Sequence, residues 1–287
     1  LALDKVQDGI CQGLTRYDMM STAFFAYDLS ILIKIYKALG KDSSKYEQEL
    51  ECVKLAYQKE FIKDGHMIGD KAYLFSDMER TCYTQTGIVM TLYMDLCKKE
   101  DRESLANDLV ELIKDCGNKM STGFIGTPYI LYALTESGHK DYAYKLLFQE
   151  EYPSWLYSVN KGATTMWEHY DGIKEDGSFW YESMNSFNHY AYGAVFGWMF
   201  NNCVGISPIE PGYKEISIKP LIDKRLGFVD CKFKTQYGFV EVHWDVKDNQ
   251  YNYKIIVPNG IKANIQLENG FIKTLENGGT IEETYYD

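Results

Sequence analysis

The sequence predicts an α+β protein of two domains, with paired antiparallel helices over residues 1–207 and a small antiparallel β-sandwich over residues 208–287. Two patterns support this prediction. Up to about residue 150, apolar residues recur every three or four positions, which is typical of amphipathic helices. Beyond Pro208 they alternate with polar residues, which is the period of a half-buried strand. A chain of 287 residues has room for one large domain or two ordinary ones.

The helical part begins with two strongly patterned segments. The first helix is expected over about 19–39, with an apolar stripe formed by Phe24, Tyr27, Ile31, Ile35 and Ala38. The second is expected to end near Phe61, and Ser44 with Glu47 fits a capping box at its start. Five more helices are expected, at about 84–97, 102–116, 127–136, 140–149 and 187–204. Such helix pairs form bundles, solenoids or (α/α) toroids, and the lack of a fixed-period repeat weighs against a regular solenoid.

An irregular, aromatic-rich segment separates the sixth and seventh expected helices. Pro153 ends the helical rhythm, and four of the chain's five tryptophans lie between residues 151 and 200. Loops longer than about 12–15 residues tend to be functional or disordered, and the many large aromatic residues argue against disorder. In a toroid the loops at one end line a cleft, and residues 153–186 are long enough to form such a loop.

The last 80 or so residues alternate apolar and polar side chains in four runs, around residues 216–218, 240–246, 251–257 and 263–267. Asp248-Asn249, Asn259-Gly260 and Asn269-Gly270 are turn signals between these runs. We therefore expect a small antiparallel sandwich with Trp244 in its core.

Residues 161–172 and 184–191 carry the candidate site. Glu168 directly follows Trp167 and precedes a second acid, Asp171, and the later segment adds His189. A carboxylate, aromatic walls, amides and an imidazole are the groups needed to hold a sugar ring, whose C–H face stacks on aromatic rings while its hydroxyls bind polar groups. Each residue type also has a structural interpretation, so this pattern alone leaves sugar binding open.

Several nearby residues have two interpretations. Trp167 and Trp180 are interpreted either as a sugar-stacking wall or as core packing beneath the loop. Asn188 is interpreted either as a hydroxyl-binding residue or as a helix cap, and for Asn185 we favour the cap. We expect His169 at the surface, and the turn that contains Glu175 and Asp176 in solvent.

Composition excludes several classes of partner. A net charge of −11 argues against binding nucleic acid or an anionic membrane, because both need clustered Lys and Arg. The acids are not clustered at metal-ligand spacing, and no cofactor is indicated. The seven cysteines are scattered, and most of them sit among apolar residues, which is typical of buried thiols. With no C-x-x-C pair, they indicate a reducing, cytoplasmic setting. No apolar stretch reaches the roughly 18 residues of a membrane span, although a chain that begins at Leu1 suggests that the native N-terminus is missing.

The segment Gly-Ala-Thr-Thr-Met-Trp-Glu at residues 162–168 resembles the bacterial α-L-rhamnosidases of glycoside hydrolase family 78. Four other segments resemble the same family in the same order, and the resemblance covers essentially the whole chain. They are residues 122–129, 152–157, 184–193 and 211–220. The resemblance implies an (α/α)6 toroid followed by a C-terminal β-sandwich. It also implies hydrolysis of terminal α-L-rhamnosides, in oligosaccharides or other glycosides, with inversion.

The resemblance implies roles for individual residues. An inverting glycosidase uses one carboxylic acid to protonate the leaving oxygen and a second carboxylate to activate water, about 6.5–9.5 Å apart. Glu168 matches the general base, and His189 matches a histidine that contacts the bound rhamnose. The general acid of the family lies in a motif resembling Glu-Arg-Leu-Gly-Trp, which belongs upstream of Leu1. The one similar string here, residues 225–228, lacks the glutamate and falls in the β domain.

We therefore expect the C-terminal portion of a rhamnosidase, which is inactive alone because it carries the base without the acid. The helices next to the missing ones should keep an apolar face, covered by a second copy in a homodimer or disordered. Two alternatives remain at this point. One is another (α/α)-toroid hydrolase with a different sugar substrate. The other is a non-catalytic carbohydrate-binding or structural module, whose sugar affinity would not respond to Glu168→Gln.

Overall fold

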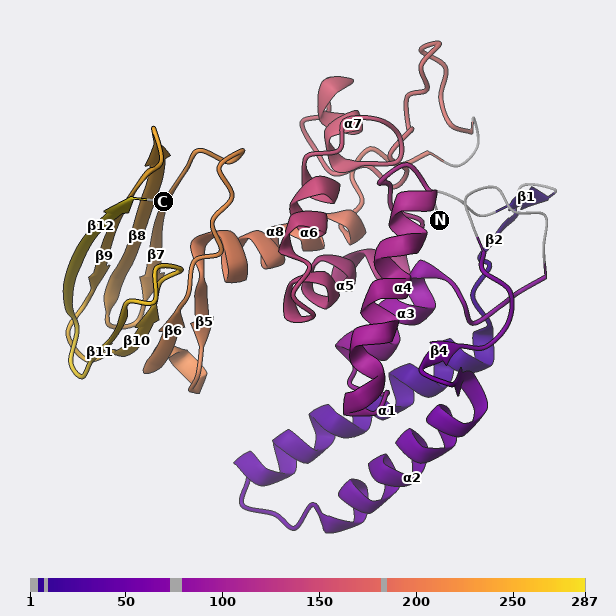
Figure 1. Cartoon of the computed structure of the whole chain (residues 1–287), viewed down its shortest axis with the longest axis horizontal. Helices are drawn as coiled ribbons and strands as arrows, with labels where there is room; N and C mark the ends of the chain where they lie inside the picture. Colours follow the sequence, from indigo (N-terminus) through magenta and orange to yellow (C-terminus); the bar gives the residue numbers. More distant parts are fainter. Residues whose placement is uncertain (1–4, 8–9, 73–78, 182–184, 287) are drawn as a thin grey trace. The chain divides into compact units, whose positions relative to one another are not determined.

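The computed structural model describes residues 5–7, 10–72, 79–181 and 185–286. The chain divides into two compact units, Leu1–Ala194 and Val195–Asp287. Figure 1 shows the helices of the first unit and the sheets of the second. The expected domain boundary between residues 207 and 208 stays a prediction.

The described residues of the first unit form helix pairs. The helices are α1 (Tyr17–Ala38), α2 (Ser44–Phe61), α3 (Gln85–Tyr93), α4 (Arg102–Asp115), α5 (Gly123–Glu136), α6 (Lys140–Leu147) and the short α7 (Trp155–Asn160). Helix α1 packs on α2, α3 on α4 and α5 on α6, and α3 also packs on α5. Two short antiparallel strand pairs accompany them, β1 (Lys5–Gln7) with β2 (Ile10–Gln12) and β3 (Ile62–Lys63) with β4 (His66–Met67). The paired helices expected from the sequence are confirmed.

Helix α3 is the central helix of this unit. Every residue from Gln85 to Leu92 is buried, as expected of a helix surrounded by others. The Thr84 hydroxyl caps its start by accepting a hydrogen bond from the Gly87 N–H at 2.9 Å. The helix ends at Tyr93, earlier than expected, because Asp95 adopts a left-handed conformation with φ of 56°.

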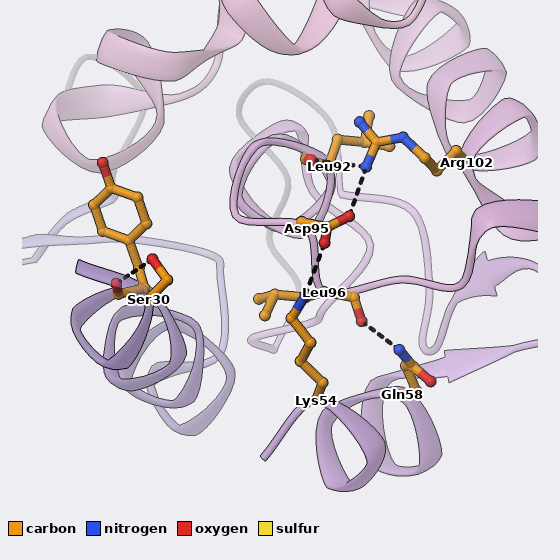
Figure 2. Close-up of polar contacts among 8 residues, drawn as sticks. Ser30, Lys54, Gln58, Leu92, Asp95, Leu96 and Arg102 are labelled. Carbon is orange, nitrogen blue, oxygen red and sulfur yellow. Dashed lines mark hydrogen bonds and ion pairs between the residues drawn. The ribbon is translucent and has the colours of Figure 1, made fainter. Parts of the chain in front are cut away.

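The turn after α3 is tied to both neighbouring helices, as Figure 2 shows. The Asp95 carboxylate forms ion pairs with Lys54 of α2 at 2.7 Å and with Arg102 of α4 at 3.4 Å. Beside it, the Gln58 amide of α2 donates a hydrogen bond to the Leu96 carbonyl at 3.0 Å. Exposed ion pairs stabilise a fold little, so their main effect is to set how one helix pair meets the next.

Helix α1 is apolar on more than one face. Its buried residues are Met19, Ala23, Ala26, Leu29 and Ile33. The stripe expected from the sequence is a different one, and Ile31 and Ile35 in it are exposed. The pattern could not separate the two faces because both are apolar, and the small side chains of Ala23 and Ala26 suit close helix contact. By length and composition α1 could cross a membrane, but core helices of globular proteins pass the same test, and α1 packs on α2 and α3.

The cap of α2 also differs from the expectation. Ser43, not Ser44, occupies the N-cap position, and its hydroxyl donates a hydrogen bond to the Glu47 carboxylate at 2.9 Å. The backbone N–H of Ser44 instead donates to the Asp42 carboxylate at 3.0 Å. The capping box predicted for Ser44 and Glu47 is therefore wrong, because the N-cap is Ser43, four residues before Glu47, and its side chain makes no cap hydrogen bond to the backbone.

The second unit contains two four-stranded sheets. Their strands are β5 (Ile206–Pro208), β6 (Glu215–Ile218), β7 (Phe228–Thr235), β8 (Gly238–Lys247), β9 (Gln250–Val257), β10 (Lys262–Gln266), β11 (Ile272–Leu275) and β12 (Gly279–Tyr286). The strand orders are β11-β10-β6-β5 and β12-β9-β8-β7, and all pairs are antiparallel except β6 with β10. Both sheets contribute to one core, which includes Ile216, Ile265, Val242 and Trp244. The sandwich and the buried Trp244 are confirmed.

The helix expected over 187–204 is broken. A 3-10 turn (Ala191–Ala194), α8 (Val195–Trp198) and a π-helical turn (Met199–Val204) take its place. Gly205 ends the π-helical turn with φ of 88°, and a Cβ there would lie 2.3 Å from the Pro220 nitrogen. Residues 187–190 lie outside any helix, because their backbone contacts residues 165–168 instead.

Candidate functional site

Two segments that the sequence singled out lie side by side. The Glu168 N–H donates to the Ser186 carbonyl at 2.9 Å, and the His189 N–H donates to the Met166 carbonyl at 2.8 Å. The Thr165 hydroxyl also donates to the Phe187 carbonyl. The backbone therefore brings Glu168 and His189 onto paired segments, although 21 positions separate them in the sequence.

The Glu168 side chain is half-buried. Its carboxylate makes no hydrogen bond or ion pair with the residues that the structure describes. A carboxylate that is held by its backbone, with no partner for its oxygens among the described residues, can accept a proton from a water molecule. Two cavities, of about 530 Å³ beside Arg102 and about 360 Å³ beside Arg16, lie elsewhere in the described residues.

Trp167 lies in the interior of the loop. It is 5% exposed, and its ring meets the Phe187 ring edge-on at a centroid distance of 5.0 Å. Gly172 packs against both, because a Cβ there would lie 3.2 Å from each of the two rings. Most of the indole is thus covered by protein, and its role as a sugar-stacking wall stays a prediction.

His169 is fully buried at 0% exposure, so its predicted surface position is wrong. Its ring stacks on Trp180 at a centroid distance of 3.7 Å and an interplanar angle of 9°. Neither ring nitrogen has a hydrogen-bond partner among the described residues. Burial disfavours the charged form and lowers the pKa of His169 to about 4, so the imidazole is neutral at pH 7.

Asp171 and Asn185 both adjoin Gly172, Asp171 as its neighbour in the chain and Asn185 through a hydrogen bond. Burial raises the pKa of the Asp171 carboxyl, whose Oδ1 has no hydrogen-bond partner among the described residues. The Asn185 amide donates to the Gly172 carbonyl at 3.1 Å, so Asn185 bridges two loop segments and the predicted helix cap there is wrong. Asn188 is exposed at a position where no helix begins.

His189 is held between two aromatic rings. Phe124, from the first turn of α5, stacks on it at 4.7 Å with an interplanar angle of 10°, and Tyr190 stacks at 5.3 Å with an angle of 9°. The Ala191 N–H donates to His189 Nδ1 at 3.4 Å, so Nδ1 acts as an acceptor and Nε2 is the ring nitrogen that can donate a hydrogen bond to a ligand. No sequence pattern singled out Phe124, although it lies in the motif at residues 122–129.

The described residues contain no group of three or more His, Cys, Asp or Glu that could hold a metal ion. The arrangement is instead one of a half-buried carboxylate, a histidine with an available N–H donor and several aromatic rings. These groups suit a carbohydrate, whose hydroxyls and C–H faces they can bind.

Residues 5–203 match the family model for the bacterial alpha-L-rhamnosidase 6 hairpin glycosidase domain. Residues 205–281 match the model for the bacterial alpha-L-rhamnosidase C-terminal domain. Relatives named alpha-L-rhamnosidase include one from Formosa agariphila, 36% identical over 91% of this chain and 27% of its own length. Another, from Streptomyces avermitilis, is 36% identical over 92% of this chain and 26% of its own length. The chain thus spans about a quarter of the length of these relatives.

Solved structures show the same similarity. The structure of the Streptomyces avermitilis alpha-L-rhamnosidase complexed with L-rhamnose matches with a TM-score of 0.82 and 31% sequence identity. The match covers 99% of this chain and 29% of that enzyme's chain. The structure of the native alpha-L-rhamnosidase from Aspergillus terreus matches with a TM-score of 0.86 and 31% sequence identity. The match covers 95% of this chain and 31% of that enzyme's chain. With both domain models matched in order, this chain belongs to the bacterial α-L-rhamnosidase family, glycoside hydrolase family 78.

Proposed function

We propose that this chain is the part of an inverting α-L-rhamnosidase that carries the general base, Glu168. The observation that supports it most is the pairing of residues 165–168 with 186–189, which holds Glu168 and His189 on adjacent segments. Membership of the α-L-rhamnosidase family, with one similar structure named as a complex with L-rhamnose, supports a terminal α-L-rhamnosyl group as the substrate.

In the proposed reaction Glu168 takes a proton from a water molecule. The water oxygen attacks the anomeric carbon from the face opposite the leaving group, and the glycosidic C–O bond breaks. A separate carboxylic acid protonates the departing oxygen, and the product has inverted configuration. This mechanism needs a base, and the half-buried Glu168 carboxylate, which has no hydrogen bond or ion pair among the described residues, suits that role.

We assign the neighbouring residues to substrate binding. His189 donates a hydrogen bond from Nε2 to a rhamnose hydroxyl, since its Nδ1 already accepts from Ala191. Trp180, which is half-buried, and Trp167, which is 5% exposed, form the apolar wall of the sugar site. Asp171 and Asn188 support these groups without touching the reacting atoms.

We infer that the general acid belongs to a part of the enzyme outside these 287 residues, because the chain spans about a quarter of its relatives. The chain alone is therefore expected to hydrolyse a chromogenic aryl α-L-rhamnoside no faster than a blank. A longer polypeptide that completes the six-hairpin domain is the control, and it should turn the substrate over. The inference would be overturned if the chain alone turned the substrate over and Glu168→Gln abolished that activity. The general acid would then lie within these residues, with Asp171 as the first candidate.

We also propose that the isolated chain forms a homodimer through α1. Ile31 and Ile35 are exposed on this helix and Leu39 is exposed at its C-cap, and in a pure solution only a second copy can cover them. Light scattering should give twice the chain mass of 33.2 kDa. Ile35→Glu should yield a monomer, whereas Val159→Glu, at an exposed apolar residue of α7, should leave the dimer intact. A monomeric unmodified chain would contradict this proposal.

A further inference from the structure

The buried imidazole of His169 needs a physical explanation. A buried polar group without a hydrogen-bond partner costs stability, and both ring nitrogens of His169 are in this position among the described residues. The contact that compensates for this cost is the face-to-face stack on Trp180, at 3.7 Å and 9°. The useful property of His169 at this position is therefore its flat, uncharged ring.

Trp180 belongs to a hairpin formed by residues 172–181. The Lys174 N–H donates to the Ser178 carbonyl at 2.8 Å, and the Trp180 N–H donates to the Gly172 carbonyl at 3.2 Å. The tip of this hairpin, residues 175–178, is exposed. Ring contacts hold the hairpin at its base, because Trp180 stacks on His169 while Phe179 meets Phe187 at 5.8 Å.

The stack also decides which face of Trp180 is available. The imidazole covers one face of the indole, so a sugar ring can stack only on the other. Because His169 directly follows Glu168, the stack fixes the indole relative to the proposed base. A displaced indole would weaken sugar binding before it affected proton transfer, since Glu168 is held separately through Ser186.

We propose that His169 is a positioning residue that fixes Trp180, and with it the 172–181 hairpin, beside Glu168. The inference rests on the proposed function for its substrate, but the stack itself can be tested without any sugar. The relevant variants are His169→Ala, which removes the ring, and His169→Phe, which keeps a flat ring without nitrogens. Trp180→Ala and the double variant complete the set.

Limited trypsin digestion of the 287-residue chain reports on the hairpin, because Lys174 lies within it. His169→Ala should speed cleavage after Lys174 about three- to tenfold, the range expected for loss of one aromatic pair. The His169→Phe variant should be cleaved after Lys174 at the same rate as the parent chain. Cleavage after Lys140, at the start of α6, is the internal control. In the Trp180→Ala background, His169→Ala should add no further effect.

The second measurement is L-rhamnose affinity and steady-state kinetics in the complete enzyme. His169→Ala should raise the Kd and KM about three- to tenfold with kcat nearly unchanged, and His169→Phe should restore both. The proposal is overturned if His169→Phe changes the cleavage rate and KM as much as His169→Ala does. It is also overturned if the effects of His169→Ala and Trp180→Ala add up in the double variant. If the cleavage results hold but no variant binds L-rhamnose, the proposed function fails while the stack stands. If His169→Ala does not fold, His169→Phe and Trp180→Ala still decide the question.

Discussion

Replacing Glu168 with glutamine is expected to lower kcat of the complete enzyme about 10²–10⁴-fold, the usual contribution of a general base. Glutamine has nearly the shape of glutamate but cannot accept a proton from water. The backbone contact between Glu168 and Ser186 does not involve the side chain, so the loop should keep its structure. Steady-state assays with an aryl α-L-rhamnoside measure the effect, and KM should change much less than kcat.

A matched control is Glu175→Gln, which removes a carboxylate from the exposed tip of the same loop. It should leave kcat and KM unchanged. Azide offers a sharper test, because this anion can attack the anomeric carbon without losing a proton. Azide should restore turnover in the Glu168→Gln enzyme and give the β-configured rhamnosyl azide. Retention of most activity by Glu168→Gln would show that another residue is the base.

The second large effect is expected in the β-sandwich. Trp244→Ala should lower the free energy of unfolding of this unit by about 3–5 kcal/mol, the range for removing a large core aromatic residue. Trp244 is 0% exposed at the centre of the core, and its indole N–H donates to the Cys203 carbonyl at 2.7 Å. Trp244→Phe should lower the free energy of unfolding by less, because phenylalanine keeps most of the packing. What it loses is mainly the hydrogen bond, worth about 1 kcal/mol.

Urea denaturation monitored by circular dichroism measures these differences. Phe228→Ala is the control, because this aromatic residue of β7 is 64% exposed and its loss should change the free energy by less than about 0.5 kcal/mol. Equal destabilisation by Trp244→Ala and Phe228→Ala would contradict the core assignment.

Local patterns in the sequence were enough to predict most of the fold. The helix pairs α1–α2, α3–α4 and α5–α6 follow from apolar periodicity, and β8 and β9 follow from strict alternation, in which most of the apolar positions are buried. The four expected runs did not include β5, β7, β11 and β12. The residues of β7, β11 and β12 are all partly or fully exposed, so buried and exposed positions do not alternate clearly there. The break in the expected 187–204 helix depends on pairing with residues 165–168, which no local pattern shows.

The candidate site was also predictable in part from local sequence patterns. Glu168 and His189 lie in motifs that stand out along the chain, and the structure brings those motifs together. The burial of His169 could not be predicted, because it depends on the 172–181 hairpin folding back and placing Trp180 over the ring. Phe124 contacts His189 only because α5 begins beside the loop, which is a tertiary arrangement.

The parallel pairing of β6 with β10 affects the order in which the C-terminal unit can assemble. Strands β7, β8 and β9 follow one another in the chain and pair with their neighbours, so this meander can form early from local contacts. Strand β6 must wait for Lys262–Gln266, which arrives only after the whole meander. On a translating ribosome, the edge of β6 that later receives β10 therefore stays open until residues 262–266 have been made.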